Sequence, residues 1–144
     1  MSLHRRPVGR GRIIAGVSAL ILIVGCVLPW FTVGSSEFSL PPRSENAFEG
    51  PSIAVFLIAL ATLALITLPY ASDRPVSFDR WWAYAAFAVV GWIGLGLRMF
   101  NVIVTPGGLE TITPDRAIGL WVSIVGLALL SRAAYLISRE PEYR

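Results

Sequence analysis

Four long apolar stretches alternate with polar segments along the chain. A helix rises about 1.5 Å per residue, so the stretch up to Val104 comfortably spans a hydrocarbon core of about 30 Å, and each of the others falls within the length range of about 17–25 residues of membrane helices. The polar segments 32–50 and 105–113 follow the first and third stretches. The pattern predicts an all-α integral membrane protein, a single domain of residues 1–144 built as a bundle of four transmembrane helices. We expect the spans at about 13–31, 51–68, 81–104 and 114–137.

Residues with strong positional preferences mark the predicted borders of these spans. Pro51 stands at the first position of the second span, where the missing N–H of proline costs nothing, and Pro69 is expected to end that span. The run Thr113-Pro114-Asp115 has the cap, the proline and the acid that are typical of a helix start, so we expect the fourth span to begin at Pro114. Trp30 is expected to act as an aromatic anchor at a membrane interface.

The distribution of arginine predicts the orientation of the bundle. All twelve basic residues are arginine, which we take as the signature of a bacterial, GC-rich genome. Nine of them lie before the first span, in the segment 71–80 or at the end of the chain, and three lie on the opposite side. Because basic residues are retained in the cytoplasm, we expect both termini inside (N-in/C-in) and the segments 32–50 and 105–113 outside. This predicts a multi-pass protein of the cell membrane, either an inner or a plasma membrane. The nine are Arg5, Arg6, Arg10, Arg12, Arg74, Arg80, Arg132, Arg139 and Arg144, and the three are Arg43, Arg98 and Arg116.

Composition narrows the chemistry that this chain can carry out. Hydrophobic residues make up 55% of the chain and the mean hydropathy is +0.67, values outside the range of soluble globular domains. The single cysteine, Cys26, excludes an internal disulfide, and the single histidine, His4, lies outside the spans, where it cannot ligate a haem in the membrane. The arginines gather at membrane borders and not on one folded face, which argues against nucleic acid as a partner. We therefore expect no cofactor, no metal and no enzymatic activity.

Arg98 is the one charge that lies well inside an apolar stretch running toward the outside, that is, the first or the third stretch. It follows Trp81 by 17 residues, about 25 Å along a helix axis, and so lies just below the outer border of the membrane. Its side chain can extend to the lipid headgroups, pair with an acid from the outer segments, or form part of a substrate or ion site, and the sequence leaves these readings open. The nearest acids by topology are Glu49 before the second span and Glu110 and Asp115 before the fourth.

The third span has one face of small residues and one of bulky residues. Gly91 and Gly94 share the face of Arg98, which predicts that this face packs against another helix, from the first span, the fourth span or a partner chain. The opposite face is expected to meet lipid or a looser contact. Small residues also indicate helix interfaces in the first span, at Ala15 and Ala19, and in the fourth, at Gly119 and Ser123. The bulky face consists of Trp82, Val89, Ile93 and Phe100.

These patterns favour a structural function by elimination. We expect an accessory or structural subunit that packs within a larger membrane assembly, with lipids, other integral membrane subunits or copies of itself as partners. Two alternatives stay open: a small transporter or channel that acts as a homo-oligomer with Arg98 near its outer mouth, and a cell-contact protein that uses the segment 32–50.

Overall fold

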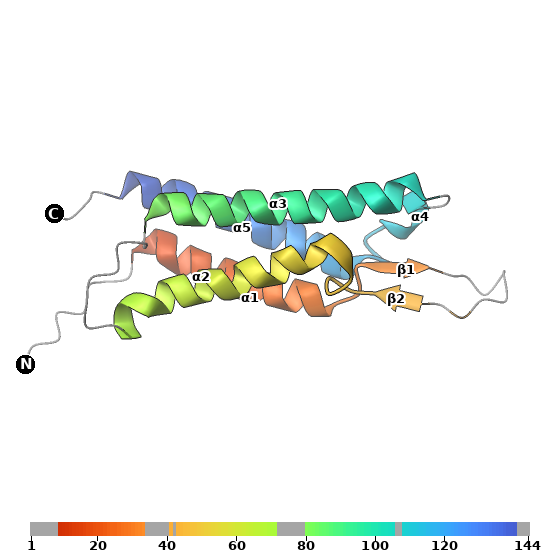
Figure 1. The fold of residues 1–144 in the computed structure, drawn as a ribbon, viewed down its shortest axis with the longest axis horizontal. Helices are drawn as coiled ribbons and strands as arrows, with labels where there is room; N and C mark the ends of the chain where they lie inside the picture. Colours follow the sequence, from red (N-terminus) through yellow and green to blue (C-terminus); the bar gives the residue numbers. More distant parts are fainter. Residues whose placement is uncertain (1–8, 34–40, 42, 72–79, 106–107, 141–144) are drawn as a thin grey trace, which may run out of the picture.

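The computed structural model describes residues 9–33, 41, 43–71, 80–105 and 108–140, and most of them are helical. Four helices are long and apolar enough to cross a membrane, as the hydrophobic pattern predicts (Figure 1). A short 3-10 turn, η2, leads into the second long helix, and a single helical turn, α4, lies between the last two. The long helices are α1 (Arg10–Val27), α2 (Ile53–Ala71), α3 (Trp81–Val104) and α5 (Ile118–Arg139); the short elements are η2 (Gly50–Ser52) and α4 (Gly108–Thr111).

The four long helices form a ring in the order α1, α2, α3, α5, and each packs against the two beside it in that order. At one end of the bundle the first turn of α1 meets the last residues of α5. There Arg12 Nη1 donates to Glu140 Oε2 at 3.2 Å, and the backbone N–H of Gly11 donates to Glu140 Oε1 at 3.3 Å. The opposite end carries a β-hairpin and α4 (Figure 1). The two ends therefore differ in kind, one closed by helix termini and the other by the hairpin.

The closest approach of two long helices is between α1 and α5. A Cβ atom added to Gly119 would lie 2.5 Å from the carbonyl oxygen of Leu28 and 2.7 Å from that of Gly25. On the facing side, a Cβ on Gly25 would lie 3.0 Å from the backbone nitrogen of Ser123. Small residues permit this approach further along as well, since a Cβ on Gly126 of α5 would lie 3.3 Å from the backbone nitrogen of Leu22 in α1. The first and fourth spans, more than the glycine-bearing third, thus form the tightest pair.

The segment predicted as a polar loop, 32–50, contains a β-hairpin instead. Strand β1 (Phe31–Val33) pairs antiparallel with β2 (Arg43–Glu45). Helix α1 ends at Val27 because Pro29 disfavours the helical conformation of the residue before it. Trp30 then turns into the protein: it is fully buried and its indole Nε1 donates to the carbonyl of Gly25 at 2.9 Å. Its predicted role as an interface anchor is therefore wrong, because the side chain is fully buried within the protein.

The borders of the first, second and fourth helices also differ from the predicted ones: α1 covers Arg10–Val27 and not 13–31, α5 starts later and α2 ends later. Helix α5 begins at Ile118, not at Pro114, because residues 113–116 form a turn in which the carbonyl of Thr113 accepts the N–H groups of Arg116 and Ala117, each at 3.0 Å. The carbonyl of Pro29, just before the hairpin, accepts the N–H of Gly119 at 2.9 Å. This bond gives a partner to one of the N–H groups in the first turn of α5, which have none within the helix. Helix α2 continues through Pro69 to Ala71, since a proline in the last turn removes only one hydrogen bond.

Apolar side chains and small residues fill the interior of the bundle. The buried hydroxyls of Ser18 and Thr62 donate to carbonyls one turn back in their own helices, those of Ala15 at 2.8 Å and Ile58 at 2.7 Å. Among the described residues no charged side chain is buried. The interior of one chain is therefore mostly apolar, and Ser123 Oγ is a buried side-chain oxygen without a hydrogen-bond partner among the described residues.

Candidate functional site at the hairpin end

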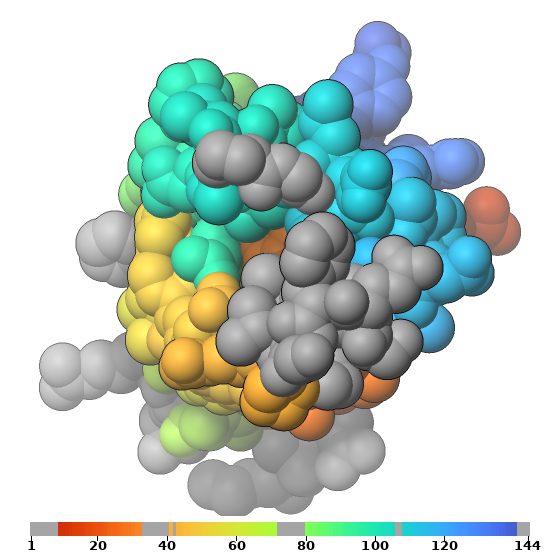
Figure 2. Space-filling view, turned by 90° about the vertical axis from the view of Figure 1, so that its right-hand side faces the viewer, coloured from red at the N-terminus to blue at the C-terminus, as the bar shows by residue number. Residues whose placement is uncertain are grey.

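Arg98 forms the centre of a cluster where α3, the hairpin and η2 meet. Its Nη2 atom lies 2.5 Å from Oε2 of Glu45 in β2, and its guanidinium carbon lies 5.4 Å from the ring centroid of Phe31 in β1. The side chain of Arg98 is 14% exposed and that of Glu45 is 30% exposed. Figure 2 looks onto this end, where the teal C-terminal part of α3 touches the gold segment that holds β2 and η2. The pair thus ties the hairpin to α3 in a partly desolvated position.

The register of the hairpin places the two partners of Arg98, Glu45 and Phe31, side by side. Phe31 and Glu45 are directly opposite each other in the antiparallel pair, so their side chains lie on the same face of the hairpin. The backbone holds this position: the N–H of Trp30 donates to the carbonyl of Glu45 at 2.8 Å, and the N–H of Ala47 donates to the carbonyl of Cys26 at 3.3 Å. One strand therefore supplies the carboxylate and its neighbour supplies the aromatic face.

The turn η2 closes the third side of the cluster. Gly50 has a φ of +73°, in the left-handed region that favours glycine, and a Cβ there would lie 3.5 Å from Nη1 of Arg98. Helix α3 comes close to this turn because Gly94 has no side chain: an added Cβ would lie 3.0 Å from the carbonyl oxygen of Pro51. Ser52 is fully buried and donates its hydroxyl to the carbonyl of Glu49 at 2.8 Å, which fixes the turn.

The chemistry of this cluster is that of a structural ion pair. The guanidinium is satisfied on one side by the carboxylate of Glu45 and on another by the ring of Phe31, a cation–π contact. Its Nε atom is buried and has no hydrogen-bond partner among the described residues, so the charge depends strongly on Glu45. The carboxylate of Glu45 is engaged by Arg98, and the described residues hold no group of three or more His, Cys, Asp or Glu side chains placed for a metal ion.

The acids that the sequence predicts as partners of Arg98 do not form an ion pair with it. Glu49, Glu110 and Asp115 are all exposed, and none forms an ion pair with another described residue. Glu49 is close in sequence to the cluster, but Arg98 forms its ion pair with Glu45, four residues earlier in the hairpin. Of the readings left open for Arg98, the structure therefore contains the ion pair, with a partner that topology alone did not select.

Gly91 and Gly94 lie against protein, with neighbours that differ in part from the expected ones. A Cβ on Gly91 would meet the terminal methyl groups of Ile58 in α2 and Leu127 in α5. Gly94 faces the start of the second span, near Pro51. The glycine face of α3 therefore packs on the second and fourth spans, and not on the first. The bulky residues of the opposite face, Trp82, Val89, Ile93 and Phe100, are exposed.

Sequence reasoning missed Glu45 and Phe31 because the hairpin has a weak local signal. The sequence signal for the hairpin is Phe31-Thr32-Val33, an aromatic and β-branched run that is typical of a strand. Its partner, Arg43-Ser44-Glu45, has no apolar alternation and low strand propensity. Only the pairing itself reveals that Glu45 lies opposite Phe31.

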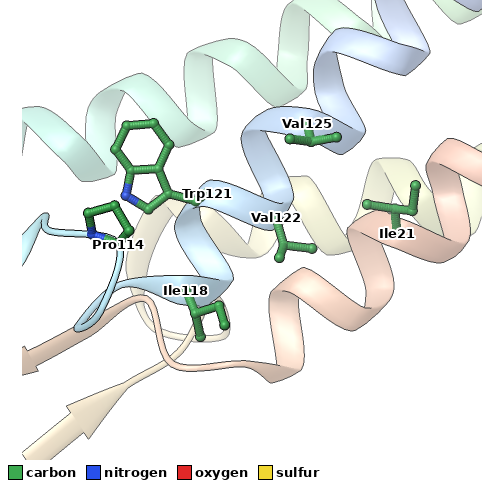
Figure 3. Close-up of a pocket in the computed structure, with 6 residues that line it drawn as sticks. All are labelled: Ile21, Pro114, Ile118, Trp121, Val122 and Val125. Atoms are coloured by element: carbon green, nitrogen blue, oxygen red, sulfur yellow. The ribbon is translucent and has the colours of Figure 1, made fainter.

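A groove on the outside of the bundle lies between α1 and α5 (Figure 3). Ile21 on α1 and Val122 and Val125 on α5 line it, with Trp121 beside Pro114 at one end. The indole Nε1 of Trp121 already donates to the carbonyl of Ile112 at 3.0 Å. The walls are thus almost wholly apolar, and they offer shape without polar recognition.

Comparison with known protein families, curated proteins and solved structures finds no match to this chain.

Proposed function

We propose that this chain is a multi-pass membrane protein with four spans and both termini in the cytoplasm, and that it acts as a non-enzymatic subunit packed in a larger membrane assembly. The observation that carries the proposal is the outward face of α3. Of the four long helices, α3 buries the smallest share of its residues, although it is the longest and carries large aromatic side chains.

A stripe at helical spacing forms the surface offered to a partner. The outer stripe of α3 consists of Val89, Ile93, Gly96 and Phe100, which follow one another by four, three and four residues and so share one face. Val89, Ile93 and Phe100 are each more than half exposed. A Cβ on Gly96 would meet nothing within 4 Å, so this glycine leaves a notch between bulky neighbours. A notch of this kind admits the side chain or backbone of another helix.

The mostly apolar interior, in which no charged side chain of the described residues is buried, supports a packing role over transport by one chain. Ions and polar solutes need polar groups along their path, whereas the buried hydroxyls of Ser18 and Thr62 are bound within their own helices. A transporter or channel would therefore need several copies of the chain to enclose a path. The Arg98–Glu45 pair supports the same role, because it holds the hairpin as a fixed cap on the bundle.

Substitution of Gly96 by leucine tests the partner surface. Because nothing lies within 4 Å of an added Cβ, Gly96→Leu should leave the stability of the chain unchanged or slightly raised, by at most about 1 kcal/mol from helix propensity. It should lower the yield of co-purifying membrane subunits at least several-fold after extraction in mild detergent. The measurement is the stoichiometry of the purified assembly, by quantitative mass spectrometry.

Gly16→Leu is the matched control for this variant. Gly16 lies in α1, where an added Cβ would meet Ile66 Cδ1 at an ordinary 3.8 Å, and it is outside the outer stripe. It should retain the partner. A partner that persists in Gly96→Leu contradicts the proposed surface, and a pure homo-oligomer in the wild type favours the transporter alternative.

The proposed orientation predicts the accessibility of two engineered cysteines. In a Cys26→Ala background, Ser44→Cys in β2 should react with a membrane-impermeant maleimide added to intact cells, whereas Ser77→Cys should react only after lysis. The reason is the excess of arginine on the side of residue 77, which retains that side in the cytoplasm. The reverse labelling pattern would invert the orientation.

A further inference from the structure

A second groove lies between α3 and α5 in the half of the bundle away from the hairpin, with a volume of about 330 Å³. We call it the α3–α5 groove. Trp81, at the start of α3, lines it near the end of the bundle, and Trp92, eleven residues further on, lines it near the middle. At about 1.5 Å per residue this distance is roughly 16 Å, close to half of a hydrocarbon core of about 30 Å. The length of the groove along α3 therefore matches the thickness of the hydrocarbon part of one membrane leaflet. Ala85 on α3 and Ser131, Tyr135 and Ser138 on α5 also line it.

Three polar side-chain atoms in the walls of this groove, on Trp92, Ser131 and Ser138, already have partners. Trp92 Nε1 donates to Ser131 Oγ at 3.1 Å, and Ser131 Oγ donates to the carbonyl of Leu127 at 2.9 Å. Near the end of α5, Ser138 Oγ donates to the carbonyl of Tyr135 at 2.7 Å. Because these donors are used within the protein, the groove is suited to an apolar chain and not to a polar solute.

Two arginines, Arg80 and Arg139, lie at the end of the groove near Trp81. Arg80 directly precedes Trp81, and the guanidinium carbon of Arg139 lies 5.1 Å from the ring centroid of Tyr135. Among the described residues, the acid next to Arg139 is Glu140, which is bound to the first turn of α1 through Arg12. Arg80 and Arg139 are exposed, and neither forms an ion pair within the part of the chain that the structure describes. Two cationic side chains thus stand where an apolar groove opens toward the membrane surface.

The groove between α1 and α5 provides an internal comparison. It is also apolar, but the residues that follow Pro114 at its end are Asp115 and Arg116, one of each charge. Apolar shape is therefore common to both grooves, whereas the described charges that stand without an ion pair at the end of the α3–α5 groove, Arg80 and Arg139, are both positive. This combination is complementary to a lipid that carries both an apolar chain and a net negative headgroup.

We propose that the α3–α5 groove is a binding site for an anionic phospholipid of the leaflet on the arginine-rich side. One acyl chain lies along Trp81 and Trp92, and the phosphate lies near Arg139 and Arg80. The site rests on the proposal that the chain spans a membrane, but it does not depend on the identity of any protein partner.

Quenching of tryptophan fluorescence by brominated lipids tests the site, because bromine quenches only tryptophans that it contacts. The full chain is placed in vesicles of phosphatidylcholine with phosphatidylglycerol as the minor lipid, and either one or the other lipid is brominated. The contribution of Trp92 is the difference between the wild type and Trp92→Phe. Per mole of lipid, brominated phosphatidylglycerol should quench Trp92 about fivefold more effectively, the factor expected for one arginine at a membrane surface.

Three variants give the proposal its controls. Arg139→Gln should reduce the preference for phosphatidylglycerol, with Arg80 left to hold the rest, whereas Arg10→Gln, which removes the same charge at the same end of the bundle but on α1, should preserve the preference. Ala85→Phe should lower the quenching of Trp92 by both lipids because the new ring fills the groove. Arg139 is exposed at a helix end, so its variant remains informative if Ala85→Phe fails to fold.

Several outcomes would overturn the site. These are equal quenching by the two lipids in the wild type, an equal loss in Arg10→Gln and Arg139→Gln, and a Trp92 that neither lipid quenches while other tryptophans are quenched, which would place protein in the groove. Absence of quenching at every tryptophan would instead contradict membrane insertion, and with it the proposed function, so the two failures are distinguishable.

Discussion

Replacement of Gly119 by alanine is expected to lower the free energy of unfolding by about 2 kcal/mol. The added Cβ would lie 2.5 Å from the carbonyl oxygen of Leu28 and 2.7 Å from that of Gly25. Both are backbone atoms at the end of α1, so they cannot rotate away, and the two helices must separate. Overpacking of this kind costs about 3 kcal/mol at the upper end of its usual range, and the higher helix propensity of alanine offsets about 1 kcal/mol of it.

Two other glycine variants serve as controls for this prediction. Gly91→Ala should cost less than Gly119→Ala, because its Cβ would meet only the mobile side-chain ends of Ile58 and Leu127. Gly96→Ala meets nothing and should be neutral or slightly stabilising. The measurement is unfolding in mixed micelles with a rising fraction of dodecyl sulfate, followed by circular dichroism. If Gly119→Ala unfolds at the same detergent fraction as Gly96→Ala, the close α1–α5 contact is wrong.

Substitution of Glu45 by glutamine is expected to lower the free energy of unfolding by about 2 kcal/mol. Loss of one partner from a fully buried ion pair costs about 3–5 kcal/mol, and solvent screening reduces this figure here because Glu45 is 30% exposed. The cost arises because Arg98, 14% exposed and with a buried Nε that lacks a partner among the described residues, would keep its charge without a carboxylate. The ring of Phe31 alone would not compensate for this loss.

A double variant and the ion pair at the opposite end distinguish this cost from a general effect of charge removal. Arg98→Met with Glu45→Gln should recover more than half of the loss, since no charge is then left unpaired. Glu140→Gln breaks the more exposed pair with Arg12 and should cost less than about 1 kcal/mol. Arg98→Met should also speed trypsin cleavage after Arg43, because the hairpin loses its tie to α3. Equal stability of Glu45→Gln and Glu140→Gln would contradict a special role for the Arg98 cluster.

The Arg98 cluster and the outer stripe lie on opposite sides of α3, and both affect how this helix would meet a partner. The cluster attaches the hairpin to the side of α3 that faces the bundle, through Glu45 and Phe31. The outer stripe, with Gly96 at its notch, lies on the exposed side of the same helix. A partner on the stripe would therefore contact a helix whose position is held by the hairpin, so Glu45→Gln should weaken assembly as well as folding.

The number of long helices could be predicted from the sequence because the hydrophobic pattern is local. A run of some twenty apolar residues has one way to satisfy its backbone in a hydrocarbon environment, which is to form a helix. The third span illustrates this: charged Arg80 and the polar Thr105 bound it, and the helix occupies Trp81–Val104 as predicted. The alternation of glycine and bulky faces on this helix likewise required only helical periodicity, and the structure places Gly91 inside and Ile93 outside.

The tertiary structure alone decided which residues meet. Glu45 is the partner of Arg98 because of strand register, and a shift by one residue would turn its side chain to the other face of the hairpin. No local property of Arg43-Ser44-Glu45 specifies that register; it arises from long-range hydrogen bonds such as that from the N–H of Trp30 to the carbonyl of Glu45. For the same reason the start of α5 at Ile118 depends on the hairpin region, whose Pro29 carbonyl accepts the N–H of Gly119. Local periodicity determines where helices form, whereas contacts between distant segments determine their exact ends and the pairing of the few charges that they bury in part.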